Sequence, residues 1–156
     1  MKPFIPGLVH TPVTPFTGDD RIDFEVYGRL IEFHLREGAQ ALALPMHAGE
    51  SVSLSDAERR ELLEHALKKV GGRVPVIAHV SQSGTGLAVE LARHAAQAGA
   101  AAVVAAAPYY WTPPPAMLLE HFTQIGKAAG IPFFIYHSPV EMAGVKVSTD
   151  LVMKLI

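Results

Sequence analysis

The sequence predicts an α/β protein built around a parallel sheet, and two observations carry this prediction. Short apolar runs recur about every thirty residues, and each is followed by a stretch whose apolar residues have the spacing of an amphipathic helix. The five runs are Leu8–Val13, Ala41–Met46, Val74–Val80, Ala101–Ala107 and Ile131–Tyr136. Strands that alternate with helices form parallel sheets, in which ligands bind at the carboxyl ends of the strands.

The same pattern fits two architectures. One is an open sheet with helices on both faces, and the other is part of an eight-unit barrel, which normally needs about 250 residues. The runs are continuously apolar rather than alternating, as expected for strands that are buried on both faces. We expect one domain over residues 1–156 with about five strand–helix units, because no stretch rich in proline, glycine or serine divides the chain.

Each predicted helix begins or ends at a residue that favours a helix terminus. Asp23 can cap a helix after the first run, and Gly38 can close it. Ser55 to Glu58 have the sequence of a capping box, and the helix that they open is expected to end at Gly71. Further helices are expected over 87–98, from the prolines at 113–115 to about 129, and from about 148 to the end of the sequence.

Composition excludes several classes of function. The chain of 156 residues has a formal net charge of −2 and no basic stripe, so we expect no binding to nucleic acid or to a membrane surface. No apolar stretch approaches the roughly 18 residues of a membrane span, and the N-terminus does not resemble a signal peptide. Cysteine is absent, which excludes disulfides and thiolate chemistry and is compatible with a cytoplasmic protein, as we expect here.

Aromatic and polar residues follow three of the runs. Tyr136 closes the fifth run, where a phenol can relay a proton or can simply pack with its hydroxyl in water. Pro108 to Trp111 place three rings after the fourth run, where they can wall a pocket or pack on the next helix. His47 to Ser51 follow the second run. Gly49 permits a tight turn there, whose backbone N–H groups can hold a carboxylate or which can simply connect a strand to a helix.

Four short motifs at the strand ends resemble one known family. They are Thr14-Pro15-Phe16, Gly49-Glu50-Ser51, Pro108-Tyr109-Tyr110 and Tyr136-x-x-Pro139. In this order and at about this spacing, over residues 5–156, they resemble the dihydrodipicolinate synthase/N-acetylneuraminate lyase family. The resemblance implies a TIM (β/α)8 barrel, of which this chain covers about the first five βα units, in a homo-oligomer (a dimer or tetramer).

The resemblance also implies a reaction. It is that of a lyase, a class I aldolase that uses pyruvate or a related 2-oxo acid as its substrate and needs no cofactor or metal. A lysine forms a Schiff base with the keto carbon, and the iminium then acts as an electron sink. By the same resemblance Tyr136 is the proton-relaying phenol, and Tyr110 is a second phenol that commonly reaches the site of a neighbouring subunit. His47 and Ala48 face the substrate carboxylate, and His137 is a further candidate for binding the substrate.

The chain departs from the family pattern around these positions. His47 and Ala48 stand where the family usually has two hydroxyl residues, so an imidazole takes the place of a hydroxyl between the two tyrosines. His137 and Glu141 stand where the synthase has an asparagine and an arginine. A carboxylate at position 141 would repel an acidic second substrate, which argues against dihydrodipicolinate synthesis itself.

The Schiff-base lysine of the family belongs to a sixth strand. Lys146 and Lys154 do not take that place, because we expect the first in a loop and the second in the last helix, both facing solvent. The chain alone is therefore expected to be inactive.

Two other functions stay open. His47, His79 and His137 each stand near the end of a run, and converging imidazoles can bind zinc in a metal-dependent barrel hydrolase. The chain can also be a non-catalytic fragment or pseudoenzyme that binds a small acid or another subunit. The remaining expectation concerns four histidines of the predicted helices, which we place on solvated faces: His34, His65, His94 and His121.

Overall fold

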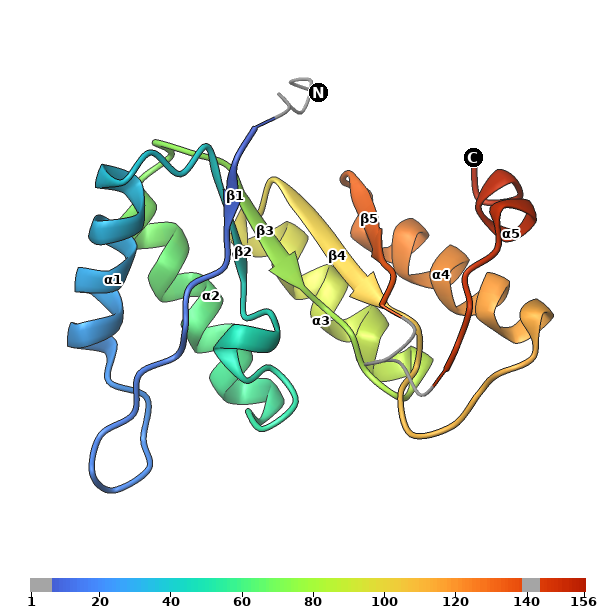
Figure 1. The fold of residues 1–156 in the computed structure, drawn as a ribbon, viewed down its shortest axis with the longest axis horizontal. Coiled ribbons are helices and arrows are strands. Elements are labelled where there is room, and N and C mark those ends of the chain that lie inside the picture. Colours follow the sequence, from blue (N-terminus) through green and yellow to red (C-terminus); the bar gives the residue numbers. More distant parts are fainter. Residues whose placement is uncertain (1–6, 139–143) are drawn as a thin grey trace. The chain divides into compact units, whose positions relative to one another are not determined.

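The structure, a computed structural model, describes residues 7–138 and 144–156 (Figure 1). Strands and helices alternate along the chain, and the five parallel strands follow each other in the sheet in sequence order. The chain forms two compact units, Met1–Ile77 and Ala78–Ile156, and the strand β3 (Val76–His79) crosses the boundary between them. That the whole chain is one domain stays a prediction.

The first unit contains the start of the sheet and two long helices. β1 (Val9–His10) pairs with β2 (Ala41–Leu44), with Val9 opposite Ala41. The N–H of Leu42 donates to the carbonyl of Pro75 at 3.0 Å, which joins β2 to the segment that enters β3. The helices α1 (Phe24–Arg36) and α2 (Asp56–Val70) contact each other. A short 3-10 helix, η1 (His47–Gly49), follows β2.

The second unit contains the end of the sheet. β4 (Ala102–Ala106) pairs with β5 (Phe133–Tyr136) in register, from Val103 opposite Phe133 to Ala106 opposite Tyr136. The N–H of Val80 donates to the carbonyl of Val104 at 2.9 Å and so joins β3 to β4. Two helices that contact each other, α3 (Thr85–Ala98) and α4 (Pro115–Ala129), and a short one, α5 (Thr149–Met153), complete this unit.

Three of the predicted helix termini are confirmed. The carboxylate of Asp23 accepts a hydrogen bond from the N–H of Val26 at the start of α1. Ser55 and Glu58 form the predicted capping box, in which each side chain accepts from the other residue's backbone N–H, at 3.3 and 2.8 Å. Gly71 ends α2 in the left-handed conformation, with φ 59°, which a residue with a Cβ adopts only at a cost.

Several bounds differ from the prediction, and the residues explain why. The first strand is only two residues long instead of the predicted Leu8–Val13, since Pro12 has no N–H for a sheet ladder. α3 begins at Thr85, two residues before the first apolar residue Leu87 that marked its predicted start. α5 ends at Met153 rather than continuing to Ile156.

The core is mostly aliphatic, and one predicted surface histidine belongs to it. The prediction that His121 lies on a solvated face is wrong, because its side chain is 2% exposed within α4. Its Nδ1 lies 2.9 Å from the hydroxyl of Thr85. Burial lowers the pKa of His121 to about 4, because the charged imidazolium loses its hydration. Within the described part of the chain, no helix is long and apolar enough to cross a membrane.

Candidate active site

The turn after β2 is held in place by a buried hydrogen bond. Thr14 donates from its hydroxyl to the carbonyl of Gly49 at 2.7 Å, and both residues are buried. A Cβ at position 49 would lie 3.1 Å from the carbonyl oxygen of Pro12 and 3.2 Å from Cβ of Pro45. The absence of a side chain at Gly49 therefore lets the turn pack this closely against the segment after β1.

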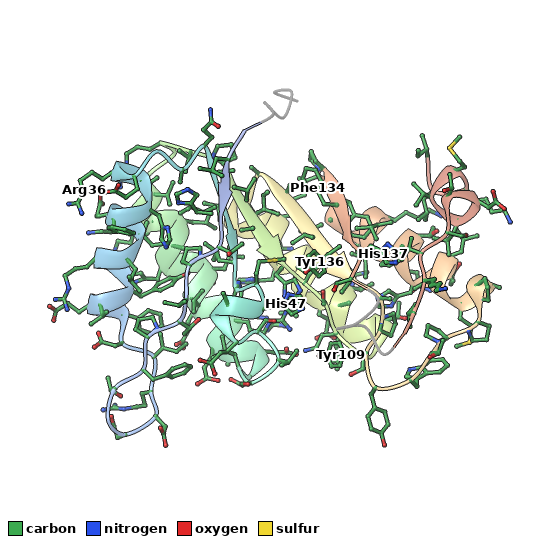
Figure 2. All side chains as sticks on the ribbon, viewed as in Figure 1. Arg36, His47, Tyr109, Phe134, Tyr136 and His137 are labelled. Carbon is green, nitrogen blue, oxygen red and sulfur yellow. The ribbon has the colours of Figure 1, made fainter. Side chains whose placement is uncertain are left out.

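This turn uses most of its own backbone donors. The N–H groups of Gly49 and Ser51 donate to the carbonyl of Met46, and the N–H of Glu50 donates to the carbonyl of His47. Those three donors are therefore engaged within the turn rather than directed to a ligand. The N–H of Ala48 takes part in none of these bonds, and both His47, which is labelled in Figure 2, and Ala48 are exposed.

The two tyrosines of the loop after β4 differ in their exposure. Tyr109 is half-buried, and its hydroxyl donates to Oε1 of Gln82 at 3.2 Å. Tyr110 is 94% exposed and has φ 85°, an unusual backbone conformation for a bulky residue. The next residue, Trp111, is 42% exposed. The loop thus fixes one phenol within the second unit and projects the other into solvent.

Tyr136 ends β5 on the face of the sheet that is turned away from α4. The ring of Phe133 packs against the ring of Phe122 of α4, with 6.0 Å between the centroids. Side chains alternate along a strand, so Tyr136, three residues later, projects from the opposite face. It is half-buried there, at the carboxyl end of the sheet, where parallel sheets bind their ligands (Figure 2).

His137, the residue after Tyr136, has a backbone partner. Its Nε2 accepts a hydrogen bond from the N–H of Val147 at 3.4 Å. His137 also lines a groove of about 860 Å³ formed by residues of α4, β5 and the C-terminal segment. Its neighbours in the groove are mostly apolar, among them Phe134 and Val152. The structure thus gives this histidine a contact with the segment that precedes α5.

Sequence reasoning missed one polar contact of the second unit. Nε2 of His79, at the end of β3, lies 2.7 Å from the hydroxyl of Ser81. The same hydroxyl accepts a hydrogen bond from the N–H of Ala106, at the end of β4, at 2.7 Å. The presence of two polar residues, His79 and Ser81, at the end of the third apolar run was the available signal, but the bond to Ala106 depends on the register of two strands that are distant in sequence.

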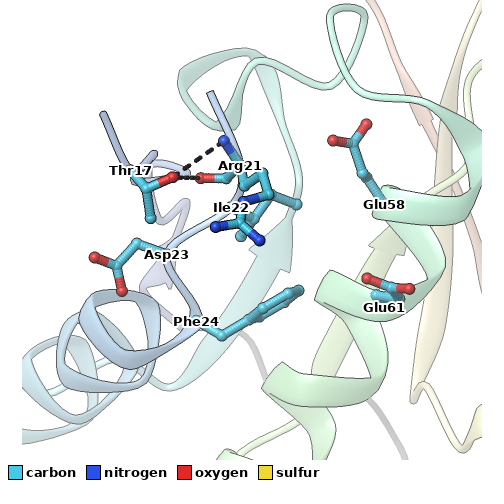
Figure 3. A pocket seen from close by; sticks show the side chains of 7 residues that line it. All are labelled: Thr17, Arg21, Ile22, Asp23, Phe24, Glu58 and Glu61. Carbon is cyan, nitrogen blue, oxygen red and sulfur yellow. Dashed lines mark hydrogen bonds between the residues drawn. The ribbon is translucent and has the colours of Figure 1, made fainter. Parts of the chain in front are cut away.

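A hollow in the first unit and the predicted zinc site are the other candidates for a functional site. The hollow of about 510 Å³ in Figure 3 lies in the first unit between the segment that enters α1 and the first turns of α2, and none of the predicted site residues lines it. Its charged residues include Arg21, Glu58 and Glu61. Within residues 7–138 and 144–156, no group of three His, Asp or Glu side chains could hold a metal ion, so the zinc hydrolase gains no support.

Two of the residues named from the sequence lie outside the described part of the chain, and two are exposed lysines. Pro139, which completes one motif, and Glu141 lie outside the described residues. Lys146 is exposed in a loop, as predicted. Lys154 is also exposed, but it follows the end of α5 rather than lying within the helix.

The fold and these strand ends define a class of protein: the βα units of a TIM barrel with tyrosines after β4 and at the end of β5. Comparison with known sequences then gives the family. The dihydrodipicolinate synthetase family matches residues 5–156, and the chain belongs to this family. The resemblance read from the four motifs is therefore confirmed.

Individual relatives support the same conclusion. The chain is 36% identical over 137 residues to a 4-hydroxy-tetrahydrodipicolinate synthase of Caldicellulosiruptor saccharolyticus, covering 88% of this chain and 46% of that protein. The crystal structure of dihydrodipicolinate synthase from Aquifex aeolicus matches with a TM-score of 0.93 and 35% identity, over 97% of this chain and 51% of that one. A prophage protein of the dihydrodipicolinic acid synthase family from E. coli K12, solved in complex with pyruvate, matches with a TM-score of 0.91 and 30% identity, over 96% of this chain and 50% of that one.

These matches confirm the predicted fold class. The chain has the fold of the N-terminal part of the TIM barrel of these proteins. It spans about half the length of the relatives it matches.

Proposed function

We propose that this chain is part of a class I aldolase, a lyase that forms a Schiff base with pyruvate or a related 2-oxo acid. The observation that carries the proposal is the placement of Tyr136 at the carboxyl end of β5, on the face turned away from α4. Membership of the family adds support, as does the pyruvate bound in the solved prophage protein. The proposal concerns the complete natural protein, because the chain spans half the length of its relatives.

The chemistry requires an amine and a proton relay. A lysine amine adds to the keto carbon of pyruvate, water leaves, and an iminium forms. Loss of a proton from the methyl carbon then gives an enamine, whose carbon attacks a carbonyl acceptor. By family resemblance the lysine belongs to a sixth strand, and we propose that residues 1–156 alone are inactive for this reason.

We propose that the two phenols move the protons of this reaction. Tyr136 is the relay beside the reacting carbon, because a half-buried phenol at a strand end can both donate and accept a proton. Tyr110 is the second phenol and serves the site of a neighbouring subunit in a homo-oligomer. Its 94% exposure and its φ of 85° support a role outside its own unit, since packing within this unit does not explain either.

The turn after β2 is proposed to bind the carboxylate of the 2-oxo acid. The N–H of Ala48 takes part in none of the internal bonds of that turn, and the imidazole of His47 adds a second polar group. His137 is proposed to support the site through its contact with Val147 beside the end of β5. Glu141 disfavours an acidic second substrate, so we propose an acceptor without a carboxylate at that place. The absence of cysteine is compatible with a cytoplasmic location.

Borohydride trapping tests the proposal. Incubation of the complete protein with pyruvate and sodium borohydride should reduce the iminium and leave a 1-carboxyethyl group on one lysine, located by peptide mass spectrometry. Omission of pyruvate is the blank. Tyr136→Phe should retain the adduct but slow the exchange of the methyl protons of pyruvate for deuterium by about 100-fold or more. A complete protein that forms no adduct would contradict the proposed function.

A further inference from the structure

A pair of buried polar side chains lies where β3 ends. The His79 and Ser81 residues are 6% and 3% exposed, and Nε2 of the imidazole lies 2.7 Å from the serine hydroxyl oxygen. That oxygen also accepts a hydrogen bond from the N–H of Ala106 at 2.7 Å. Burial of an imidazole and a hydroxyl is unfavourable unless they are hydrogen-bonded, so this arrangement is a specific one rather than a consequence of packing alone.

The register of the strands relates this pair to Tyr136. In the ladder between β4 and β5, Val103 lies opposite Phe133, and the N–H of Val103 donates to the carbonyl of Pro132, the residue that precedes Phe133. A strand residue therefore lies opposite the residue that follows its hydrogen-bond acceptor. The same rule applied to the bond from Val80 N–H to Val104 O places Val80 opposite Ala105 and therefore Ser81 opposite Ala106.

One row of residues thus crosses the carboxyl end of three strands. Ser81 lies opposite Ala106, and Ala106 lies opposite Tyr136. Ala106 and Tyr136 lie in one row and project from the face turned away from α4, and the hydroxyl of Ser81, just after β3, reaches the N–H of Ala106. His79, the last residue of β3, lies opposite Val104, two rows before Ala106, and therefore projects from the same face.

We infer that His79 and Ser81 are positioning residues for Tyr136 in the proposed reaction. The inference rests on the proposed function and adds a part of the site that the family motifs do not include. Ser81 holds the end of β4 through the N–H of Ala106, which is the residue paired with Tyr136. His79 in turn fixes the orientation of the serine hydroxyl.

The inference includes one tautomer of the imidazole. In it the oxygen of Ser81 accepts from the N–H of Ala106 and donates its own proton to Nε2 of His79, so that the neutral imidazole carries its proton on Nδ1. Protonation of Nε2 would place two protons between the nitrogen and the oxygen. The serine would then lose Nε2 as the acceptor of its own proton, while its oxygen, which has two lone pairs, could still accept from the N–H of Ala106.

The ionisable neighbours of His79 on this face are few in the described strands of the sheet. β4 contributes Val104 and Ala106, neither of which titrates, and β5 contributes Phe134 and Tyr136.

Deuterium exchange into the methyl group of pyruvate, followed by NMR from about pH 5 to about pH 9, tests this inference on the complete protein. Ser81→Ala and His79→Phe should slow the exchange about tenfold or more while the yield of the borohydride-trapped adduct stays unchanged. His79→Gln retains an acceptor near the position of Nε2. It should keep the rate within about threefold. Ser83→Ala, at an exposed serine two residues later, is the matched control and should change neither quantity.

An unchanged exchange rate in Ser81→Ala would overturn the inference, and this variant decides the matter if His79→Phe does not fold. Failure of the unaltered protein to form an adduct would instead overturn the proposed function. In that case the nitrogen chemical shifts of the His79 imidazole give a separate answer. A neutral ring with its proton on Nδ1, whose Nε2 signal shifts in Ser81→Ala, supports the arrangement, and a ring with its proton on Nε2 overturns it.

Discussion

Thr14 and Gly49 are joined by a buried 2.7 Å hydrogen bond from the threonine hydroxyl to the glycine carbonyl, across thirty-five residues of sequence. This contact links the segment after β1 to the turn that carries His47 and Ala48. Thr14→Val keeps the shape of the side chain but leaves the carbonyl of Gly49 without this donor. We expect a loss of about 1–3 kcal/mol in the free energy of unfolding, measured by urea titration.

Thr11→Val provides the matched control for that measurement, because Thr11 is exposed in the same segment. Its effect should stay within about 0.5 kcal/mol. Equal stabilities of the two variants would show that the buried bond contributes nothing to the position of the turn.

Glycine at position 49 is expected to be required for packing. Gly49→Ala introduces a Cβ that meets the carbonyl of Pro12 at 3.1 Å and the side chain of Pro45 at 3.2 Å, so neighbouring atoms must move. We expect a destabilisation of about 1–3 kcal/mol in thermal or urea unfolding. Gly86→Ala is the control, since nothing lies within 4 Å of its added Cβ in the first turn of α3. It should be neutral or stabilising by up to about 1 kcal/mol.

Stability should fall between neutral and mildly acidic pH because of one buried and two half-buried histidines. Burial lowers the pKa of His121 from 6.5 to about 4, and it also lowers the pKa values of His34 and His65. Below about pH 6.5 the unfolded chain binds more protons than the folded chain, so the free energy of unfolding decreases until about pH 4. For His121 alone the loss is of the order of 3 kcal/mol.

Unfolding in urea at a series of pH values checks this prediction. His121→Asn places an amide near the position of Nδ1, where it can still bond to Thr85, and should flatten the pH dependence. The carboxylates with lowered pKa values do not cause the loss of stability in this pH range. The lowered pKa values of Glu32 and Glu58 stabilise the protein above their ordinary value of 4.5, and that contribution disappears only at lower pH. A slope that persists in the asparagine variant would contradict the assignment.

The contact between His10 and His34 should be visible in the titration of the second residue. Their Nδ1 atoms are 3.0 Å apart, so the two rings can share one proton between these atoms but not two. The pKa of His34 is lowered first by burial and then by the charge of His10. His10→Ala should therefore raise the pKa of His34 in an NMR titration, while the pKa of His65 stays constant as an internal reference. No change at His34 would show that the rings do not interact in solution.

Much of the fold could be predicted because local signals and the final structure agree. The apolar runs lie at all five strands, and Ser55 and Glu58 form the capping box that their spacing indicates. Strand lengths were overestimated where an apolar run contains a proline, as at Pro12, because hydropathy does not register a missing N–H.

The burial of His121 was missed although a signal was present. Leu118 and Ile125 lie three residues before and four residues after it, so all three share one face of α4, and that face is buried. Composition alone favours an exposed histidine, and helical position overrides that preference here.

The candidate site was only partly predictable from the sequence. Strand ends gave the positions of Tyr136 and His47, since the end of an apolar run is a local property. The row that joins Ser81, Ala106 and Tyr136 depends on the register of three strands, which no local pattern contains. The bond from Val147 to His137 likewise joins segments whose approach depends on tertiary packing.

The backbone of Tyr110 has a consequence for how this loop can change in evolution. At φ 85° a bulky side chain costs about 1 kcal/mol relative to glycine, and its ring gains little contact in return at 94% exposure. Tyr110→Gly should therefore raise the melting temperature slightly while removing the phenol. Selection for folding alone would tend to replace this tyrosine with glycine. Its presence therefore indicates selection for something other than stability at this position.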